Sequence, residues 1–394
     1  MPNSTLFDRF PMLRVGRDAA ILCLILCSLA LGAPRHTDAD TITAFDVPDA
    51  GIGLLQGTHG VSINTAGAIA GYYYDAASIG HGFLRLPHGA IITFDAAGVG
   101  TGAFQRTIPL SINDAGTITG FFDNDSRFHA FVRYPHGVIT SYDVPGAGTD
   151  AFQGTAAESI NPEGVITGFY TNFSEWAHDY RRSPHGAITT FDVLPGPFPT
   201  PTAVFTYPKS INAAGTITGF YYDIMSIAHG FLRSPRGGIT KFDPPGSVHT
   251  EAASINVAGV ITGYYGDGVQ SHGYARFPHG MIVTFDPPDS INTSPQSINS
   301  AGTITGYYQD ANFAFHGFQR ALNGAITTFD APNAGTGTNQ GTSPSSINSE
   351  GAITGYFVDA NSITHGFVLE PHRPCRPGEK ARACEKHDDD KEDR

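Results

Sequence analysis

The chain has 394 residues, with 47 Gly, 27 Pro and a formal net charge of −13. Its hydrophobic content of 40% is enough for a packed core, which excludes a wholly disordered chain. Residues 41–370 carry the whole net charge and contain only the lysines Lys209 and Lys241, so they lack the basic surface that nucleic acid or an anionic membrane requires.

The N-terminus has the pattern of an export signal. Arg9, Arg14 and Arg17 precede an uncharged run over 19–34, which ends in small residues at 30–33. This run is shorter than the ~20 apolar residues that cross a bilayer, so we predict a signal peptide over 1–32 and a linker over 33–40. After cleavage no stable membrane span remains, and the protein is expected to be secreted, periplasmic or at the cell surface. An uncleaved anchor is the alternative.

One unit is repeated seven times after this signal. Each repeat contains Ser-Ile-Asn, then Gly three residues after the Asn, then Ile, Gly and two aromatic residues, then a His, and finally an aromatic-Asp pair. The Asn residues are Asn64, Asn113, Asn161, Asn212, Asn256, Asn299 and Asn348. They number the repeats 1 to 7 below.

Each repeat predicts four short strands rich in Ile, Thr, Tyr and Phe. In repeat 1 the first strand ends at Asn64, and the others cover 68–74, 81–86 and 90–95, with hairpin turns at 64–67 and 87–89. The array opens with a lone fourth-type strand at 42–46 and ends after a third-type strand at 365–367.

We therefore predict an all-β fold over 41–370: a seven-bladed β-propeller of four-stranded antiparallel blades, closed by the N-terminal strand, which completes the last blade. A β-solenoid is the alternative. We expect a monomer.

A His and an Asp recur in each repeat with a fixed separation of 14 residues. A three-residue loop at 87–89 pairs residue 86 with residue 90 and therefore His81 with Asp95. The predicted pairs are His81 and Asp95, His129 and Asp143, His178 and Asp192, His229 and Asp243, His272 and Asp286, His316 and Asp330, and His365 and Asp46. Because neighbouring blades stack face to face, we expect these pairs to be buried and hydrogen-bonded.

These pairs are interpreted as structural, since an active site is normally single and asymmetric. A catalytic dyad or a metal site is the alternative interpretation. Two further repeated sets receive the structural interpretation: an Arg four residues after the His, and an Asp or Asn in the loop before it, which is expected to cap a turn. The repeats predict no cofactor and no metal site.

The pattern His-Gly/Ala-Phe, followed by Ser-Ile-Asn-x-x-Gly-x-Ile-x-Gly-Tyr-Tyr, resembles the bacterial extracellular HAF-type repeats. The namesake triplet is His129-Ala130-Phe131, and the resemblance covers about 41–370. It implies export and no particular activity. Repeat 3 departs most from the pattern, with Asp179 where most repeats have Gly.

Function is expected where the repeat pattern is broken. The connections that lead into repeats 7, 1, 2 and 3 contain Gln340, Gln56, Gln105 and Gln153, each two residues before a Thr. The second break is an aromatic cluster beside a carboxylate at repeats 3 and 4. These candidate ligand-binding residues, expected in exposed loops, are Glu175, Trp176, Phe198, Phe205 and Tyr207. Packing of these aromatics within their own loops is the alternative.

Two functions remain open. The first is a non-enzymatic binding module or surface scaffold for an extracellular glycan or protein. The second is a propeller-type polysaccharide hydrolase or lyase that uses acidic loop residues such as Asp125, Asp150 and Glu175, although the sequence cannot show a carboxylate pair at catalytic separation.

The C-terminal segment 371–394 is rich in charge and is predicted to be disordered. Cys375 and Cys384 would be the two cysteines left after signal cleavage, and an oxidising compartment would allow a disulfide between them.

Overall fold

The computed structural model describes residues 40–54, 56–102, 105–124, 127–173, 177–193 and 205–372. The predicted signal peptide, nearly all of the predicted linker and most of the tail, with Cys375 and Cys384, lie outside the described residues. All described residues belong to one compact unit. They form 28 β-strands and no helix, which confirms the all-β prediction.

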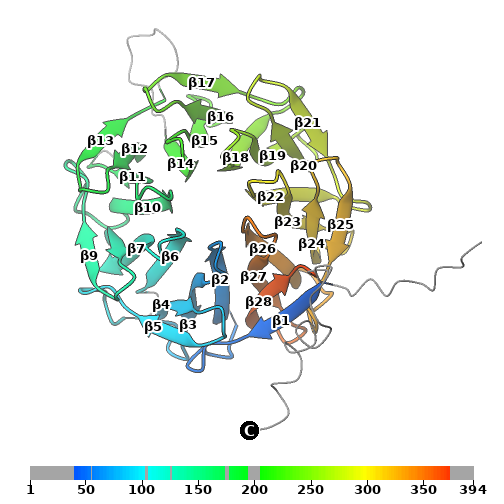
Figure 1. Cartoon of the computed structure of the whole chain (residues 1–394), viewed down its shortest axis with the longest axis horizontal. Coiled ribbons are helices and arrows are strands. Elements are labelled where there is room, and N and C mark those ends of the chain that lie inside the picture. The colour runs from blue at the N-terminus through cyan, green and yellow to red at the C-terminus, as the bar shows by residue number, and fades with distance from the viewer. Residues whose placement is uncertain are drawn as a thin grey trace, which may run out of the picture. The chain divides into compact units, whose positions relative to one another are not determined.

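The strands take four positions along the radius of Figure 1. The inner strands are β2 (Gly57–Ile63), β6 (Thr107–Ile112), β10 (Gly154–Ile160), β14 (Thr206–Ile211), β18 (His249–Ile255), β22 (Asn292–Ile298) and β26 (Gly341–Ile347). The second strands are β3 (Ile69–Tyr74), β7 (Ile118–Asn124), β11 (Ile166–Thr171), β15 (Ile217–Tyr222), β19 (Ile261–Gly266), β23 (Ile304–Gln309) and β27 (Ile353–Val358).

The third strands are β4 (Gly80–Arg85), β8 (Arg127–Arg133), β12 (Ala177–Arg182), β16 (Ala228–Arg233), β20 (Ser271–Arg276), β24 (Phe315–Arg320) and β28 (Thr364–Glu370). The outer strands are β1 (Thr41–Phe45), β5 (Ile91–Phe94), β9 (Ile139–Tyr142), β13 (Ile188–Phe191), β17 (Ile239–Phe242), β21 (Ile282–Phe285) and β25 (Ile326–Phe329).

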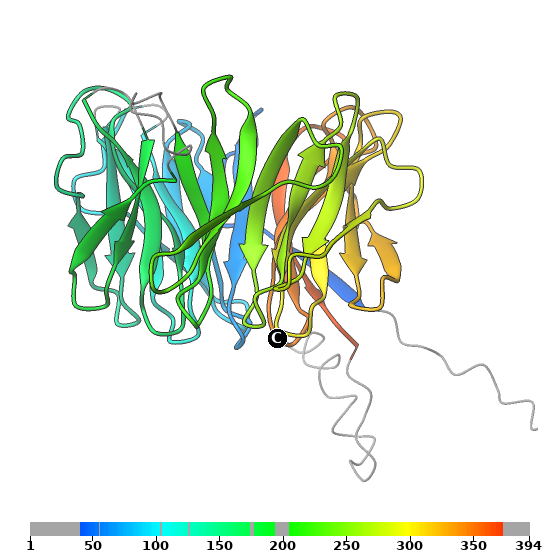
Figure 2. The same ribbon diagram turned by 90° about the horizontal axis from the view of Figure 1, so that it is seen from above.

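Antiparallel pairing joins the inner, second, third and outer strands of each repeat, as in β14-β15-β16-β17. Seen from the side, the strands run between two faces on which the loops gather (Figure 2). The lone strand predicted at 42–46 is β1, and it pairs with β28 from the other end of the described chain, with Ala44 opposite Phe367. Figure 1 shows the two strands side by side. Among the described residues, no helix is long and apolar enough to cross a membrane.

The core lies between the sheets of successive repeats. One hydrophobic cluster combines Ala70 and Leu84 of repeat 1 with Ile118 and Phe131 of repeat 2. Each sheet is therefore covered by its neighbours, which buries large side chains of the second and third strands such as Ile69 and Phe83. Burial of one such aromatic or branched side chain contributes about 1.5–3 kcal/mol.

The Ser-Ile-Asn motif links one repeat to the next. Asn64 Oδ1 accepts the Ala68 N–H and closes its own turn, in which Gly67 has a φ of +84°. Its Nδ2 donates to the carbonyl of Asn113. The same Asn-to-Asn bond recurs from repeat to repeat, and Asn348 of repeat 7 donates to the carbonyl of Asn64 at 2.9 Å.

The Ser of the motif forms a second series of bonds. Ser62 Oγ accepts the N–H of Ile112 in the next repeat, and Ser346 Oγ accepts the N–H of Ile63. Five further bonds from an Ile N–H to the Ser Oγ of the preceding repeat link repeats 2 to 7 in the same way. The motif is repeated because each of its polar groups satisfies a backbone group of its own turn or of a neighbouring repeat.

Candidate functional site

The repeated His and Asp side chains meet in every repeat. Nδ1 of each His lies 2.8–2.9 Å from a carboxylate oxygen of its Asp, including His365 and Asp46. The expectation that these pairs are buried is wrong: the His side chains are 19–25% exposed and the Asp side chains 30–50%. The reason is that each outer strand ends one residue before its Asp, as β5 ends at Phe94. The carboxylate thus lies beyond the covered part of the sheet.

The other ring nitrogen of the His faces the loop between the second and third strands. In five repeats Nε2 lies 3.4–3.8 Å from a carboxylate oxygen of Asp75, Asp223, Asp267, Asp310 or Asp359. In repeat 3, Nε2 of His178 lies 2.9 Å from the side-chain nitrogen of Asn172. The same loop carboxylates cap their own turns, as Asp267 does by accepting the N–H groups of Val269 and Gln270.

His272 illustrates the consequence for acid–base chemistry. Burial alone would lower the pKa of His272, but hydrogen bonds to Asp286 and Asp267 and their charges raise it above its ordinary value. Tyr265 packs on the ring, with centroids 5.2 Å apart. A general base needs a ring nitrogen that can reach a substrate, and here both face carboxylates. The arrangement is better explained as a structural link than as a catalytic dyad: the His connects the loop before the third strand to the loop after the outer strand.

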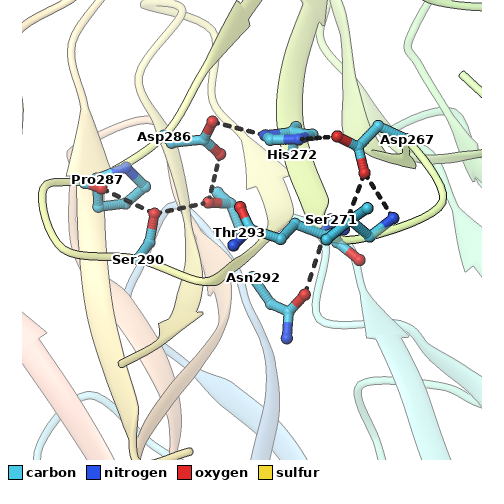
Figure 3. Close-up of polar contacts among 10 residues, drawn as sticks. Asp267, Ser271, His272, Asp286, Pro287, Ser290, Asn292 and Thr293 are labelled. Carbon is cyan, nitrogen blue, oxygen red and sulfur yellow. Dashed lines mark hydrogen bonds and ion pairs between the residues drawn. The ribbon is translucent and has the colours of Figure 1, made fainter. Parts of the chain in front are cut away.

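The hydrogen bonds of Asp286 differ from those in other repeats because Pro287 follows it (Figure 3). In four repeats the first Thr of the inner strand accepts the N–H of the residue that follows the Asp, as Thr58 accepts that of Val47. Pro287 has no N–H to donate. Thr293 Oγ1 instead donates to Asp286 Oδ1 at 2.6 Å. These bonds tie the outer strand of one repeat to the inner strand of the next.

The repeated Arg residues also join neighbouring repeats. Each guanidinium carbon lies 4.4–5.0 Å from the centre of an aromatic ring on the outer strand of the preceding repeat. The six residues are Arg85, Arg133, Arg182, Arg233, Arg276 and Arg320.

The Gln residues that break the sevenfold pattern support their own loops. Gln56 Oε1 accepts the Gly53 N–H, and its Nε2 donates to the carbonyl of Ala76 in the next loop. Gln340 makes the corresponding bonds to Gly337 and Ala360. We therefore interpret this group as loop support.

A different set of positions varies from repeat to repeat. Every inner strand has a β-bulge, where the pairing register shifts across the residue before Ser-Ile-Asn. A bulge re-aims one side chain. The bulge residues are Val61, Leu110, Glu158, Lys209, Ala253, Gln296 and Ser345. Sequence reasoning missed them, although the signal was present: this position has a different residue in every repeat, while the three that follow are invariant.

Three of these bulge residues line a cavity of about 540 Å³ between the inner and second strands of repeats 4, 5 and 6. The three are Lys209, Ala253 and Gln296. The cavity lining is completed by Phe220, Glu251, Ala252, Tyr264, Ser271, Asn292, Thr293, Ser294, Tyr307, Gln309 and Phe315. All of these residues belong to the part of the chain that the structure describes.

The charged residues of the cavity are matched. Lys209 Nζ lies 2.8 Å from Glu158 Oε2. Burial lowers the pKa of Lys209, but the charge and hydrogen bond of Glu158 and the charge of Glu251 together raise it above its ordinary value. Glu251 Oε1 lies 2.9 Å from His249 Nε2. Burial, together with the charge and hydrogen bond of Glu251, raises the pKa of Tyr264 well above its usual range.

The structure divides the candidate ligand-binding residues predicted from the sequence. Glu175, Trp176 and Phe198 lie outside the described residues. Phe205 is half-buried, and its carbonyl accepts the N–H of Tyr222. Tyr207 was expected in an exposed loop, and this is wrong.

Tyr207 instead lies in β14, two residues before Lys209, where its ring is partly buried. It packs against Phe169 and Phe220 with centroids 5.1 and 5.4 Å apart. Phe220 is one of the residues that line the cavity, so the Tyr207 ring packs against part of the cavity wall.

The acidic residues of the enzymatic alternative give no catalytic pair in the described structure. Asp125 and Glu175 lie outside the described residues, and Asp150 is exposed in a loop. Among the described residues, no group of three or more His, Cys, Asp or Glu side chains is arranged to hold a metal ion.

No protein-family model and no curated protein matches the chain. Solved structures of β-propellers do match in fold. A catalytically inactive virginiamycin B lyase from Staphylococcus aureus, solved with quinupristin, has a TM-score of 0.53 at 14% identity, over 84% of this chain and 99% of that one.

Two further β-propeller matches have different roles. The β-propeller domain of the Trilobed protease from Pyrococcus furiosus has an open velcro topology. It matches with a TM-score of 0.53 at 9% identity, over 82% of this chain and 100% of that one. The BP39L lectin from Burkholderia pseudomallei matches with a TM-score of 0.51 at 10% identity, over 84% of this chain and 96% of that one. At these identities the likeness concerns the β-propeller fold alone.

Proposed function

We propose that this chain is an exported HAF-type repeat protein whose body is a closed, seven-bladed β-propeller. The series of Asn bonds supports closure, because it returns from Asn348 to Asn64, and so does the pairing of β1 with β28. Closure leaves only short outer strands with a free edge and fits a monomer. Export is supported by the pattern of residues 1–32.

The proposed role is that of a binding module or surface scaffold for an extracellular glycan or protein. The observation that carries it is the division between repeated and varied residues. The repeated His and Asp side chains pair with each other, the Ser and Asn side chains bond to backbone groups, and the Arg side chains lie over aromatic rings. The varied bulge residues of repeats 4, 5 and 6 instead line a cavity. A cavity of about 540 Å³ lies within the range of small-ligand sites.

The test is a binding screen run beside an activity assay. The full-length protein is applied to a glycan array and a peptide array, and in parallel it is incubated with a panel of polysaccharides whose shortening is followed by chromatography. The proposal expects specific binding and no shortening. Polysaccharide cleavage that is abolished by Asp150→Ala would favour the hydrolase or lyase instead.

A further inference from the structure

We propose that the cavity lined by β14, β18 and β22 binds a neutral saccharide unit. This inference rests on the proposed binding function, and it adds the position of the site and the chemical class of the ligand.

The cavity exists because small residues occupy the middle of its wall. Ala252 and Ala253 lie in β18 between Lys209 of one neighbouring inner strand and Gln296 of the other. Ala253 is the bulge residue of its strand, so a larger side chain there would project into the same space. The hollow therefore depends on the small bulge residue of repeat 5.

Two amide side chains in the wall are held at one end and open at the other. Gln309 Oε1 accepts a hydrogen bond from Asn292 Nδ2 at 3.0 Å, and Asn292 Oδ1 accepts one from the Ser271 N–H. Gln296 Nε2 donates to Ser294 Oγ at 2.8 Å. Among the described residues, the nitrogen of Gln309 and the oxygen of Gln296 have no partner. The wall thus offers one preorganised donor and one preorganised acceptor, and a sugar hydroxyl can satisfy either.

The charges favour a neutral ligand. Lys209 is neutralised by Glu158, and Glu251 contacts His249, so the cavity has no unmatched cation to hold a carboxylate or a phosphate. The net charge of −13 also repels anions.

The remaining walls are aromatic. Phe220, Tyr264, Tyr307 and Phe315 line the cavity, and Tyr307 and Phe315 meet edge to face with centroids 5.3 Å apart. Rings next to a few fixed polar groups suit a ligand with an apolar ring face and a polar rim, as a pyranose has.

The experiment titrates the full-length protein with cellobiose, maltose, lactose and diacetylchitobiose by calorimetry, with galacturonic acid as the anionic probe. We expect at least one neutral disaccharide to bind and galacturonic acid not to bind. Ala253→Phe fills the cavity and should weaken binding about tenfold or more. Ser345→Phe places the same ring at the bulge of repeat 7 and should leave binding unchanged.

A second variant guards against misfolding of Ala253→Phe. Gln309→Ala removes the open donor without adding volume, and it should weaken binding about fivefold with an unchanged circular dichroism spectrum. Undiminished binding by both cavity variants would overturn the inference, and its loss in Trp176→Ala would then place the site on the loops. Binding of peptides without any saccharide would also overturn it, yet leave the binding function intact. A protein that binds neither class and cleaves a polysaccharide would overturn the proposed function itself.

Discussion

Asp179 is the residue at which the repeat departs from its own chemistry. The equivalent positions are Gly82, Ala130, Gly230, Gly273, Gly317 and Gly366. Asp179 is fully buried, and neither carboxylate oxygen has a hydrogen-bond partner among the described residues. Burial raises the pKa of Asp179 well above its usual range, the charge of Asp192 adds to the effect, and Arg233 opposes it.

We predict that Asp179→Ala stabilises the protein. Removal of a buried, unsatisfied carboxyl should raise the free energy of unfolding by about 1–3 kcal/mol near neutral pH. The carboxyl ionises in the unfolded chain near pH 3.8 and resists ionisation when folded, so the native state of the wild type loses stability as the pH rises above that value. Urea unfolding at pH 5 and pH 8 should therefore show a larger gain at pH 8.

The control for this variant is Asp49→Ala, which removes an exposed carboxyl and should change stability little at either pH. A less stable Asp179→Ala protein at both pH values would contradict the prediction, since it would mean that the carboxyl makes a favourable interaction.

The residue scale also marks a limit of sequence reasoning. The separation of 14 residues predicts which His and Asp lie opposite each other, because hairpin register is local. It does not predict their 30–50% exposed carboxylates, because exposure depends on how far the neighbouring sheet extends.

At the scale of the element, the strands were readable to within one or two residues. The second strand of repeat 1 was predicted over 68–74 and is β3, Ile69–Tyr74. Alternation of β-branched and aromatic residues and the Asn-x-x-Gly turns are local signals. The bond from each Asn to the next repeat was not predicted, since it depends on the packing between sheets.

The turn of repeat 5 tests that bond. Asn256 is 5% exposed, donates to the carbonyl of Asn299 and accepts the N–H of Val260. Asn256→Ala leaves the N–H of Val260 unpaired and removes the bond between repeats to the Asn299 carbonyl, which then accepts only the N–H of Gly302. This should cost about 2–4 kcal/mol in thermal or urea unfolding. Asn256→Asp keeps the acceptor and should cost less.

Asn361→Ala in an exposed loop is the matched control and should stay within about 0.5 kcal/mol of the wild type. Equal effects of Asn256→Ala and Asn361→Ala would show that the Asn series does not hold the repeats together.

At the scale of the whole molecule, the offset of the array predicted that the first strand belongs beside the last repeat. The cavity at repeats 4 to 6 was not predicted, because no local pattern shows that the bulge positions of different inner strands face a common space. The varied residues there, such as Lys209, Ala253 and Gln296, become one site only when three repeats stand side by side.

Deletion of β1 is the most direct test of the closed propeller. Residues 41–47 form five register pairs with β28 and include Asp46, the hydrogen-bond partner of His365. They also include Phe45, whose ring packs on that of Phe83 with centroids 6.0 Å apart. The protein without these residues should lose more than about 3 kcal/mol of stability and associate through the exposed edge of β28, as measured by thermal melting and light scattering. A synthetic peptide of residues 41–47 should restore the melting temperature. A deletion variant that stays monomeric and melts at the wild-type temperature would contradict closure by the N-terminal strand.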